Sequence, residues 1–171
     1  MTAAENPSAT PPSLARRLAA FLYEGVLLFG VLFFTGFLYS ASTRQQHAMQ
    51  GRTGLGVFLF VVLGVYFIGF WSRSGQTLAM KTWHLRVVDT TGELPSRKQA
   101  AVRYLLSWLW FLPALITVWA LGLHSGGAIY GSLAAGVLAY VLVARLHPQR
   151  QFLHDTLCGT QIVTWVPPRR S

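Results

Sequence analysis

The sequence of 171 residues has little charge: only 11% of its residues are Asp, Glu, Lys or Arg, whereas 53% are hydrophobic. Soluble domains carry about 25% charged residues, so this composition excludes an ordinary soluble domain as well as disordered and coiled-coil chains. Acidic residues are the scarcest, five against fourteen Lys and Arg. In a soluble protein that excess would suggest nucleic acid, but here the basic residues flank apolar runs. We therefore expect a membrane protein that binds no nucleic acid.

Cysteine is nearly absent as well, since Cys158 is the only one. It cannot form an intramolecular disulfide, and no Cys/His spacing resembles a zinc site. Four histidines are scattered without metal-ligand spacing: His47, His84, His124 and His147. The chain also lacks Gly-x-Ser-x-Gly, His-Glu-x-x-His and phosphate-cradling motifs. We expect no metal, no cofactor and no enzymatic activity.

Long apolar runs are abundant, and about 20 such residues cross the hydrocarbon core as a helix. Residues 104–144 carry no formal charge, a length that matches two helices joined by a tight turn at His124–Gly127. Pro113 should kink the first of these two helices. The sequence predicts a membrane domain over residues 14–166, between a disordered lead-in (1–13) and a basic tail (167–171). It predicts four spans within that domain, at about residues 18–39, 55–71, 104–123 and 125–144.

Basic residues predict the orientation, because Lys and Arg of short loops remain on the cytoplasmic side. Only Arg44 and Arg52 fall outside if both termini are cytoplasmic. The other twelve then lie inside: Arg16, Arg17, Arg73, Lys81, Arg86, Arg97, Lys98, Arg103, Arg145, Arg150, Arg169 and Arg170. These segments favour anionic lipid headgroups on that side of the bilayer.

The segment between the second and third spans has local structure of its own. Residues 83–88 alternate and Asp89–Gly92 supplies turn chemistry, which predicts a small cytoplasmic β-hairpin. Residues 161–166 are again strand-like and could pair with its edge. Ser96 and Gln99 form a capping-box pattern, so an interfacial amphipathic helix should lead into the third span. The predicted fold class is an all-α membrane protein with four transmembrane helices, this hairpin and this helix.

Glu24 lies six residues into the first span, where an ionised carboxylate facing lipid costs several kcal/mol. It should face other helices and meet a partner. Arg17 precedes it by nearly two helical turns, so the two share a face. Either Glu24 is functional, or it makes a static packing contact while Arg16 and Arg17 reach the headgroup phosphates.

Near the end of the chain, Asp155 follows His154 just after the fourth span. Taken alone, such an acid is more often a helix cap or a surface residue than part of a site. Small residues recur every four positions along the fourth span, at Gly127, Gly131, Ala135 and Ala139. This stripe is a packing face for another helix of the chain or for a second copy.

Several short motifs follow one another along residues 13–166. They are Arg17 with Glu24, Gly75–Lys81, Leu85–Asp89 with Gly92, Arg103, and Leu153–Asp155 with Gly159–Thr160. In this combination the chain resembles the RDD family of bacterial integral membrane proteins, which implies a bacterial cytoplasmic (inner) membrane. The family is named for an arginine and two aspartates, which correspond to Arg17, Glu24 and Asp155. Glu24 stands where the family has aspartate, and Ala79 stands where glycine is usual.

The resemblance implies a polar trio of Arg17, Glu24 and Asp155, with His154 as a secondary candidate, and a role in transport. When ionised, the trio sums to minus one, which suits a proton or small-cation site and equally suits a fixed salt-bridge network. Transport of protons, cations or another small solute, through an oligomer to which the trio contributes a site, is therefore one functional hypothesis. The other is a membrane scaffold or assembly factor that binds a partner through its hairpin, which exposed surface around Trp83 would favour.

Overall fold

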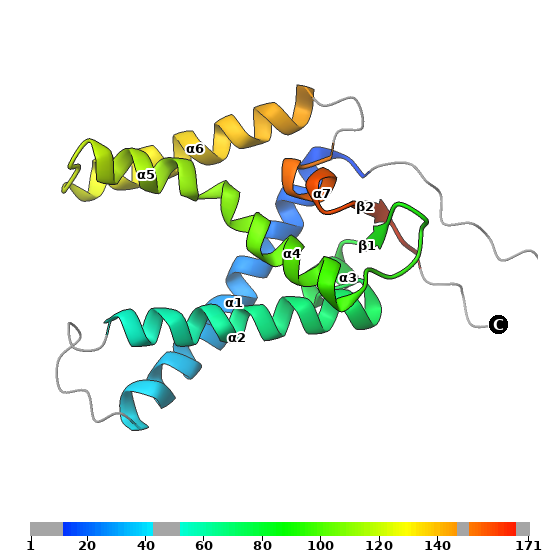
Figure 1. Cartoon of the computed structure of the whole chain (residues 1–171), viewed down its shortest axis with the longest axis horizontal. Helices are drawn as coiled ribbons and strands as arrows, with labels where there is room; N and C mark the ends of the chain where they lie inside the picture. Colours follow the sequence, from blue (N-terminus) through cyan, green and yellow to red (C-terminus); the bar gives the residue numbers. More distant parts are fainter. Residues whose placement is uncertain (1–11, 43–51, 147–150, 167–171) are drawn as a thin grey trace, which may run out of the picture.

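The structure is a computed structural model that describes residues 12–42, 52–146 and 151–166. Most of the expected lead-in, the loop residues 43–51 and the expected basic tail lie outside the described residues. The described part is mostly helical and carries one small two-stranded sheet at one end (Figure 1).

Two long apolar helices, α1 (Leu14–Ser42) and α2 (Arg52–Ser74), begin the fold. Both are long and apolar enough to cross a membrane, and only 11% and 6% of their apolar windows are buried inside the protein. Exposed apolar surface of this extent suits contact with lipid. The 29 residues of α1 measure about 43 Å at 1.5 Å per residue, which exceeds the hydrocarbon core of about 30 Å. These helices correspond to the first two predicted spans.

The third predicted span is a bent pair of helices. Ser96 caps α4 (Arg97–Ser107) in a capping box with Gln99, as its sequence predicted. A short 3₁₀ turn, η1 (Trp108–Trp110), then leads into α5 (Leu112–Ala120), and the two apolar helices meet at 43°. Pro113 sits in the first turn of α5, where its missing N–H costs no helical hydrogen bond. The predicted kink is therefore present, immediately before the proline.

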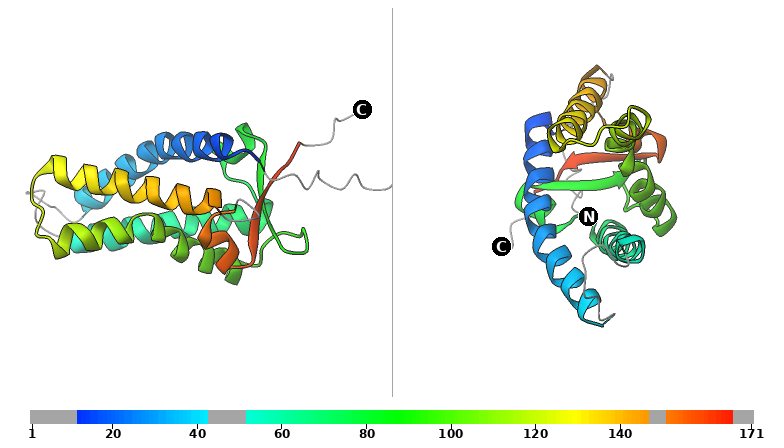
Figure 2. Two further views of the ribbon diagram at one scale, coloured as in Figure 1. Left: turned by 90° about the horizontal axis from the view of Figure 1, so that it is seen from above. Right: turned by 90° about the vertical axis from the view of Figure 1, so that its left-hand side faces the viewer.

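A tight turn then reverses the chain into α6 (Gly126–Leu146). Gly122 supplies a left-handed residue at φ +58°, and the Ser125 hydroxyl accepts a hydrogen bond from the Ala128 N–H at 3.3 Å. The apolar part of α6 is shorter than the two long helices. The described helices thus provide two candidate spans, or three when the bent pair counts as one. Figure 2 shows the helices running side by side away from the sheet.

The small-residue stripe of α6 does not make the contact with α5. Gly127, Gly131, Ala135 and Ala139 are all exposed in the described chain. The close approach is at Gly136 instead, where a Cβ atom would come within 2.9 Å of the Ala114 Cβ. Among residues 12–42, 52–146 and 151–166 the stripe is therefore no packing face, and contact with a second copy stays a prediction.

The sheet pairs two distant segments and corrects the predicted hairpin. Strand β1 (Leu85–Asp89) runs antiparallel to β2 (Thr160–Thr164), with Leu85 opposite Thr164. This confirms that the strand-like segment near residue 161 pairs with β1. The turn after β1 forms, because the Asp89 carboxylate accepts the Thr91 N–H at 2.8 Å. No strand comes between this turn and α4 in the described chain, since Pro95 lacks an N–H and the next residue already caps α4.

Two glutamine side chains cover the outer edges of this sheet. On the β1 edge, the Gln76 amide donates to the Leu85 carbonyl at 2.7 Å. On the β2 edge, the buried Gln151 amide donates to the Ile162 carbonyl at 3.4 Å and accepts the Ile162 N–H at 3.3 Å. Sheet edges left open invite pairing with other chains. Here side-chain amides take the place of further strands.

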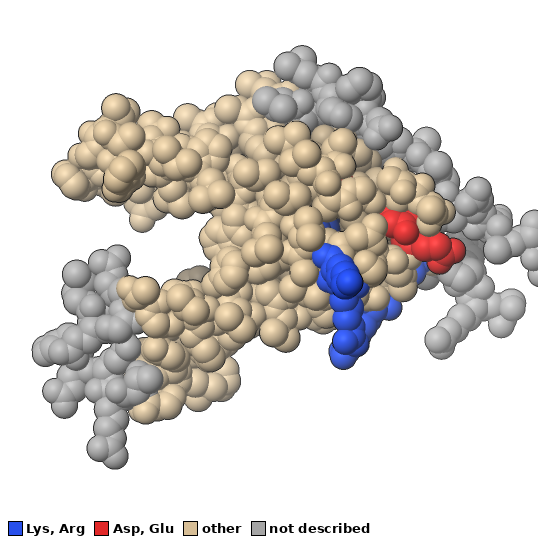
Figure 3. Space-filling view, in the orientation of Figure 1, with Lys and Arg blue, Asp and Glu red and all other residues tan. Residues whose placement is uncertain are grey.

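The buried core lies where this sheet meets the helices. Leu85 and Val87 of β1 and Ile162 of β2 pack with aromatic residues of α2 and α4, including Trp71 and Tyr104. Figure 3 shows that the charged side chains on this face also gather toward the sheet end, whereas the surface over the long helices is uncharged. The molecule therefore has one polar, packed end and one apolar, open end.

Candidate functional site

Glu24 lies inside the bundle, with only 7% of its surface exposed. The Tyr66 hydroxyl of α2 donates to Oε1 at 2.5 Å, and the Thr77 hydroxyl donates to Oε2. No ion pair of Glu24 occurs among the described residues. The prediction that Glu24 faces the bundle and meets a polar group is confirmed, and its partners are hydroxyl groups.

The Gly75–Lys81 motif explains why Thr77 reaches Glu24. Gly75 has φ +71°, and a Cβ atom there would come within 2.6 Å of the Val87 carbonyl oxygen, so glycine is required. Its own carbonyl accepts the Val87 N–H at 2.7 Å, which ties the turn to β1. Thr77 then caps α3 (Leu78–Thr82) by accepting the Met80 N–H at 3.3 Å. The Thr77 oxygen accepts that bond, so the hydroxyl hydrogen can still be donated to Glu24.

Asp155 is completely buried in α7 (Leu153–Leu157), and its ion pair is with Arg103 of α4. Arg103 is 3% exposed, stacks over the Trp71 ring at 4.7 Å and donates to the Thr160 hydroxyl at 3.0 Å. The trio inferred from the sequence assigned the arginine role to Arg17. Arg103 was visible only as one motif residue ahead of an apolar span, where a cation must find a partner or reach the headgroups.

His154 connects α7 with α6. Its backbone N–H donates to the Tyr140 hydroxyl at 3.0 Å, and that hydroxyl lies 2.9 Å from Nδ1 of the same histidine. Because the hydroxyl oxygen already accepts the backbone N–H, its hydrogen is available to Nδ1. Burial, followed by the nearby charge of Arg103, holds the pKa of His154 well below its usual value. We therefore assign a neutral imidazole that carries its proton on Nε2, which lies 3.5 Å from the Asp155 carboxylate.

The two neighbouring arginines of α1 have different surroundings. Arg17 is 4% exposed, and its guanidinium lies 4.9 Å from the centre of the Phe152 ring. The segment after α6 thus folds back onto the start of α1. Arg16 donates to the Trp83 carbonyl at 2.8 Å and the His84 carbonyl at 3.3 Å. It therefore anchors α1 to the beginning of β1 and does not simply extend toward phosphates.

The predicted trio falls into two polar groups. Glu24 belongs with Tyr66 and Thr77, whereas Asp155 belongs with Arg103 and His154. The described part of the chain contains no group of three or more His, Cys, Asp or Glu side chains that could hold a metal ion.

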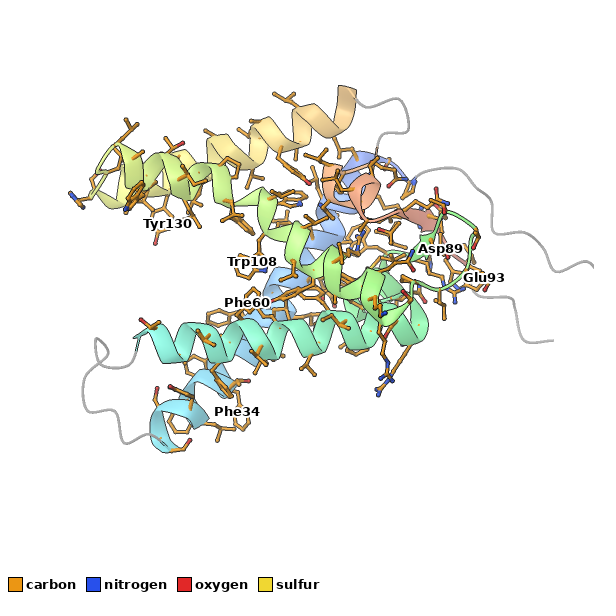
Figure 4. The ribbon with its side chains drawn as sticks, in the orientation of Figure 1. Phe34, Phe60, Asp89, Glu93, Trp108 and Tyr130 are labelled. Atoms are coloured by element: carbon orange, nitrogen blue, oxygen red, sulfur yellow. The ribbon has the colours of Figure 1, made fainter. Side chains whose placement is uncertain are left out.

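A cavity of about 510 Å³ between α1, α2 and α4 joins these groups. Its wall is mainly apolar, and Trp108 of η1, which faces Phe60 of α2 across a centroid distance of 5.4 Å, forms part of it (Figure 4). The polar or charged side chains on the wall are Arg17, Glu24, Thr77, Arg103, Ser107 and His154. Glu24 and Arg17 therefore share a cavity, although they come from positions two turns apart.

Together these features define a helical membrane protein with buried charged residues where its apolar helices meet a small sheet layer. The chain belongs to the RDD family, which matches residues 11–159. The matched region contains Arg17, Glu24, Arg103 and Asp155 and ends just before β2. Searches of curated proteins and of solved structures gave no match.

Proposed function

We propose that this protein is a four-span protein of the bacterial cytoplasmic membrane that transports, or helps to transport, protons, cations or another small solute. The observation that carries the proposal is Glu24, an acid buried in an apolar helix whose partners in the described chain are two hydroxyl groups. Such an acid is a functional candidate by default. Tyr66 and Thr77 hold it in place without neutralising it.

Asp155 contrasts with Glu24 because its charge is already balanced by Arg103. A carboxylate that is balanced in this way suits a structural role. Of the two acids in the predicted trio, Glu24 is therefore the one proposed to exchange a proton or to bind a cation. It also lines the cavity, on the same wall as Arg17 and Arg103.

Four spans with both termini in the cytoplasm are part of this proposal. The bent α4–α5 pair would be the third span, and α6 would be the fourth. The exposed basic residues of the described part support the orientation, because Arg73, Lys81, Arg97 and Lys98 border the sheet end. This end would then contact anionic headgroups, and the exposed stripe of α6 would be free to contact a second copy.

Reporter fusions test the topology. Alkaline phosphatase fused after Ser171 should be inactive, and the same enzyme inserted between the first two spans should be active. The opposite pattern would reject the orientation.

Flux in proteoliposomes tests the transport proposal. The purified protein should dissipate an imposed proton or cation gradient, and Glu24→Gln should abolish this activity. Glu93→Gln is the matched control, since Glu93 is an exposed acid in the turn after β1. A Glu24→Gln variant as active as the parent protein would reject the role of Glu24.

A scaffold function is the second candidate, and the exposure of Trp83 favours it. This residue ends α3 and is 36% exposed beside the sheet. A photo-crosslinking amino acid at position 83 in cells would give a discrete product with a partner protein. The same substitution at the exposed Thr91 is the control; equal labelling from both positions would speak against a specific surface.

A further inference from the structure

The cavity between α1, α2 and α4 has one polar end and long apolar walls. Arg17, Arg103 and His154 lie at the end next to the sheet, where Leu85 and Ile162 also contribute. Toward the open end of the helices the wall is built from aliphatic and aromatic residues: Leu28, Phe29, Leu32, Leu63, Phe67, Trp108 and Phe111. This division matches a ligand that has a polar head and an apolar tail.

The polar end contains N–H donors that no acceptor satisfies among the described residues. Arg103 Nε and Trp71 Nε1 are both shielded from solvent and donate to no described group. The two side chains stack on one another, are 3% and 6% exposed, and both line the cavity. Buried donors without acceptors are costly. A ligand oxygen beside the Arg103–Trp71 stack would satisfy them.

Charge in the cavity favours an anionic oxygen, because the two guanidinium groups on its wall outweigh the one carboxylate there, that of Glu24. Arg17 and Arg103 are the two basic side chains that the described structure buries, and both contribute to this one cavity. Asp155, which offsets Arg103, is not part of the cavity wall. Guanidinium groups bind phosphate and carboxylate oxygens through paired N–H donors.

We propose that this cavity binds an anionic phospholipid, with the headgroup phosphate beside Arg17, Arg103 and Trp71 and one acyl chain along α1 and α2. Phosphate is the anionic group of the phospholipid headgroups in the cytoplasmic leaflet, and the orientation proposed above places the sheet end on that side. A volume of about 510 Å³ lies in the range of small-ligand sites, so it takes the head and part of one chain while the rest of the lipid stays in the bilayer. The proposal goes beyond transport, because it concerns Arg103 and Trp71 and holds whether or not Glu24 carries an ion.

Two glycines of α1 provide a test and its matched control, because a larger residue at one of them would fill part of the cavity and a larger residue at the other would not. Gly25 lines the cavity, and a Cβ atom there would meet nothing within 4 Å, so Gly25→Leu introduces its side chain at an open position of the wall. Gly30 is equally open but does not line the cavity. For the headgroup, Trp71→Phe removes the N–H donor and keeps a ring for Arg103. Trp119→Phe is the control, because it removes an indole N–H from an exposed residue of α5 that does not line the cavity.

The test is native mass spectrometry of the purified protein in a neutral detergent, titrated with phosphatidylglycerol or phosphatidylcholine. We expect phosphatidylglycerol to bind about tenfold more tightly, which corresponds to about 1.4 kcal/mol. Gly25→Leu and Trp71→Phe should each weaken its binding severalfold, whereas Gly30→Leu and Trp119→Phe should bind like the parent protein. If Gly25→Leu fails to fold, lipid binding by Trp71→Phe tests the proposal.

Four results would overturn the proposal. Equal binding of the two phospholipids would exclude recognition of the anionic head. Displacement of the lipid by inorganic phosphate, or equal binding of oleate, would identify a different anion. Unchanged binding in both Gly25→Leu and Trp71→Phe would place the lipid elsewhere on the protein. None of these measurements involves flux, so they fail or succeed independently of the transport proposal.

Discussion

Asp155 forms its ion pair with Arg103 at a place where neither side chain reaches solvent. The pair connects α7, which follows the last apolar helix, to α4, which precedes the bent span. It therefore holds α7, at the end of the region that matches the family, against α4 in the middle of that region. A buried pair of this kind is costly to break, because the remaining charge has no compensation.

Removing one member of this pair should destabilise the protein strongly. Asp155→Asn and Arg103→Gln should each lower the free energy of unfolding by about 3–5 kcal/mol. The double variant should lose less than the sum of the two, with a coupling of about 0.5–3 kcal/mol. Thermal unfolding in detergent measures all three.

Arg17→Gln allows the same comparison of single and double variants to be made with a different arginine. Sequence reasoning joined Arg17 to Asp155, whereas the ion pair in the structure joins Arg103 to it. Coupling of Asp155→Asn with Arg17→Gln should therefore be weaker than coupling with Arg103→Gln. The reverse order would restore Arg17 as the main partner.

The hydroxyl of Thr77 should matter more than the size of its side chain. It caps α3 and also donates to Glu24, so Thr77→Val removes two hydrogen bonds from a buried position. We expect a loss of about 1–3 kcal/mol in the free energy of unfolding. Thr77→Ser keeps the hydroxyl and is the control. Equal stability of the two variants, again by thermal unfolding, would contradict the described geometry.

Gly75 should be the least replaceable glycine of the described chain. Alanine there must adopt a φ of +71° and place its Cβ against the Val87 carbonyl. Gly75→Ala should cost more than 1 kcal/mol, about the strain of a left-handed residue alone. Gly30→Ala is the control, because it lies in an open helical position and should stabilise the helix by up to about 1 kcal/mol. An unchanged free energy of unfolding in Gly75→Ala, measured by thermal unfolding, would show that the turn can relax.

Much of the fold could be predicted from the sequence, because apolar run length and capping chemistry are local properties. The first two spans, the capping box at Ser96 and the bend near Pro113 all follow from such patterns. The predicted hairpin was wrong, because the segment that pairs with a strand can be far away in the sequence. The alternating residues before Asp89 predict a strand, but only the folded chain shows that β2 is its neighbour.

The candidate site also has features that the sequence predicts and features that it does not. The burial of Glu24 follows from the cost of a carboxylate in lipid, which is a property of one residue. Its partners Tyr66 and Thr77 lie 42 and 53 positions away in the sequence, and hydroxyl residues are too common to identify as partners by pattern. The choice of Arg103 over Arg17 as the partner of Asp155 depends on how α7 packs. A pattern of residue types contains no information on that packing.

The last prediction concerns pH, through the buried His154. Burial lowers its pKa in the folded protein, whereas the unfolded chain titrates near the ordinary value of about 6.5. Below that pH the unfolded chain binds a proton that the folded protein does not, so acid favours unfolding. The contribution of His154 to stability is therefore complete above about pH 6.5 and is lost progressively as the pH falls toward the folded pKa.

Thermal unfolding between pH 8 and pH 5 should show this loss, and His154→Asn should remove the part of it that begins near pH 6.5. The asparagine oxygen can still accept the Tyr140 hydroxyl in place of Nδ1, so the variant changes titration more than packing. His124→Asn is the matched control, because His124 is exposed in the turn between α5 and α6 and should leave the pH profile unchanged. If His154→Asn and the parent protein lose stability in parallel down to pH 5, a different group is responsible for the acid sensitivity, and a neutral buried His154 is rejected.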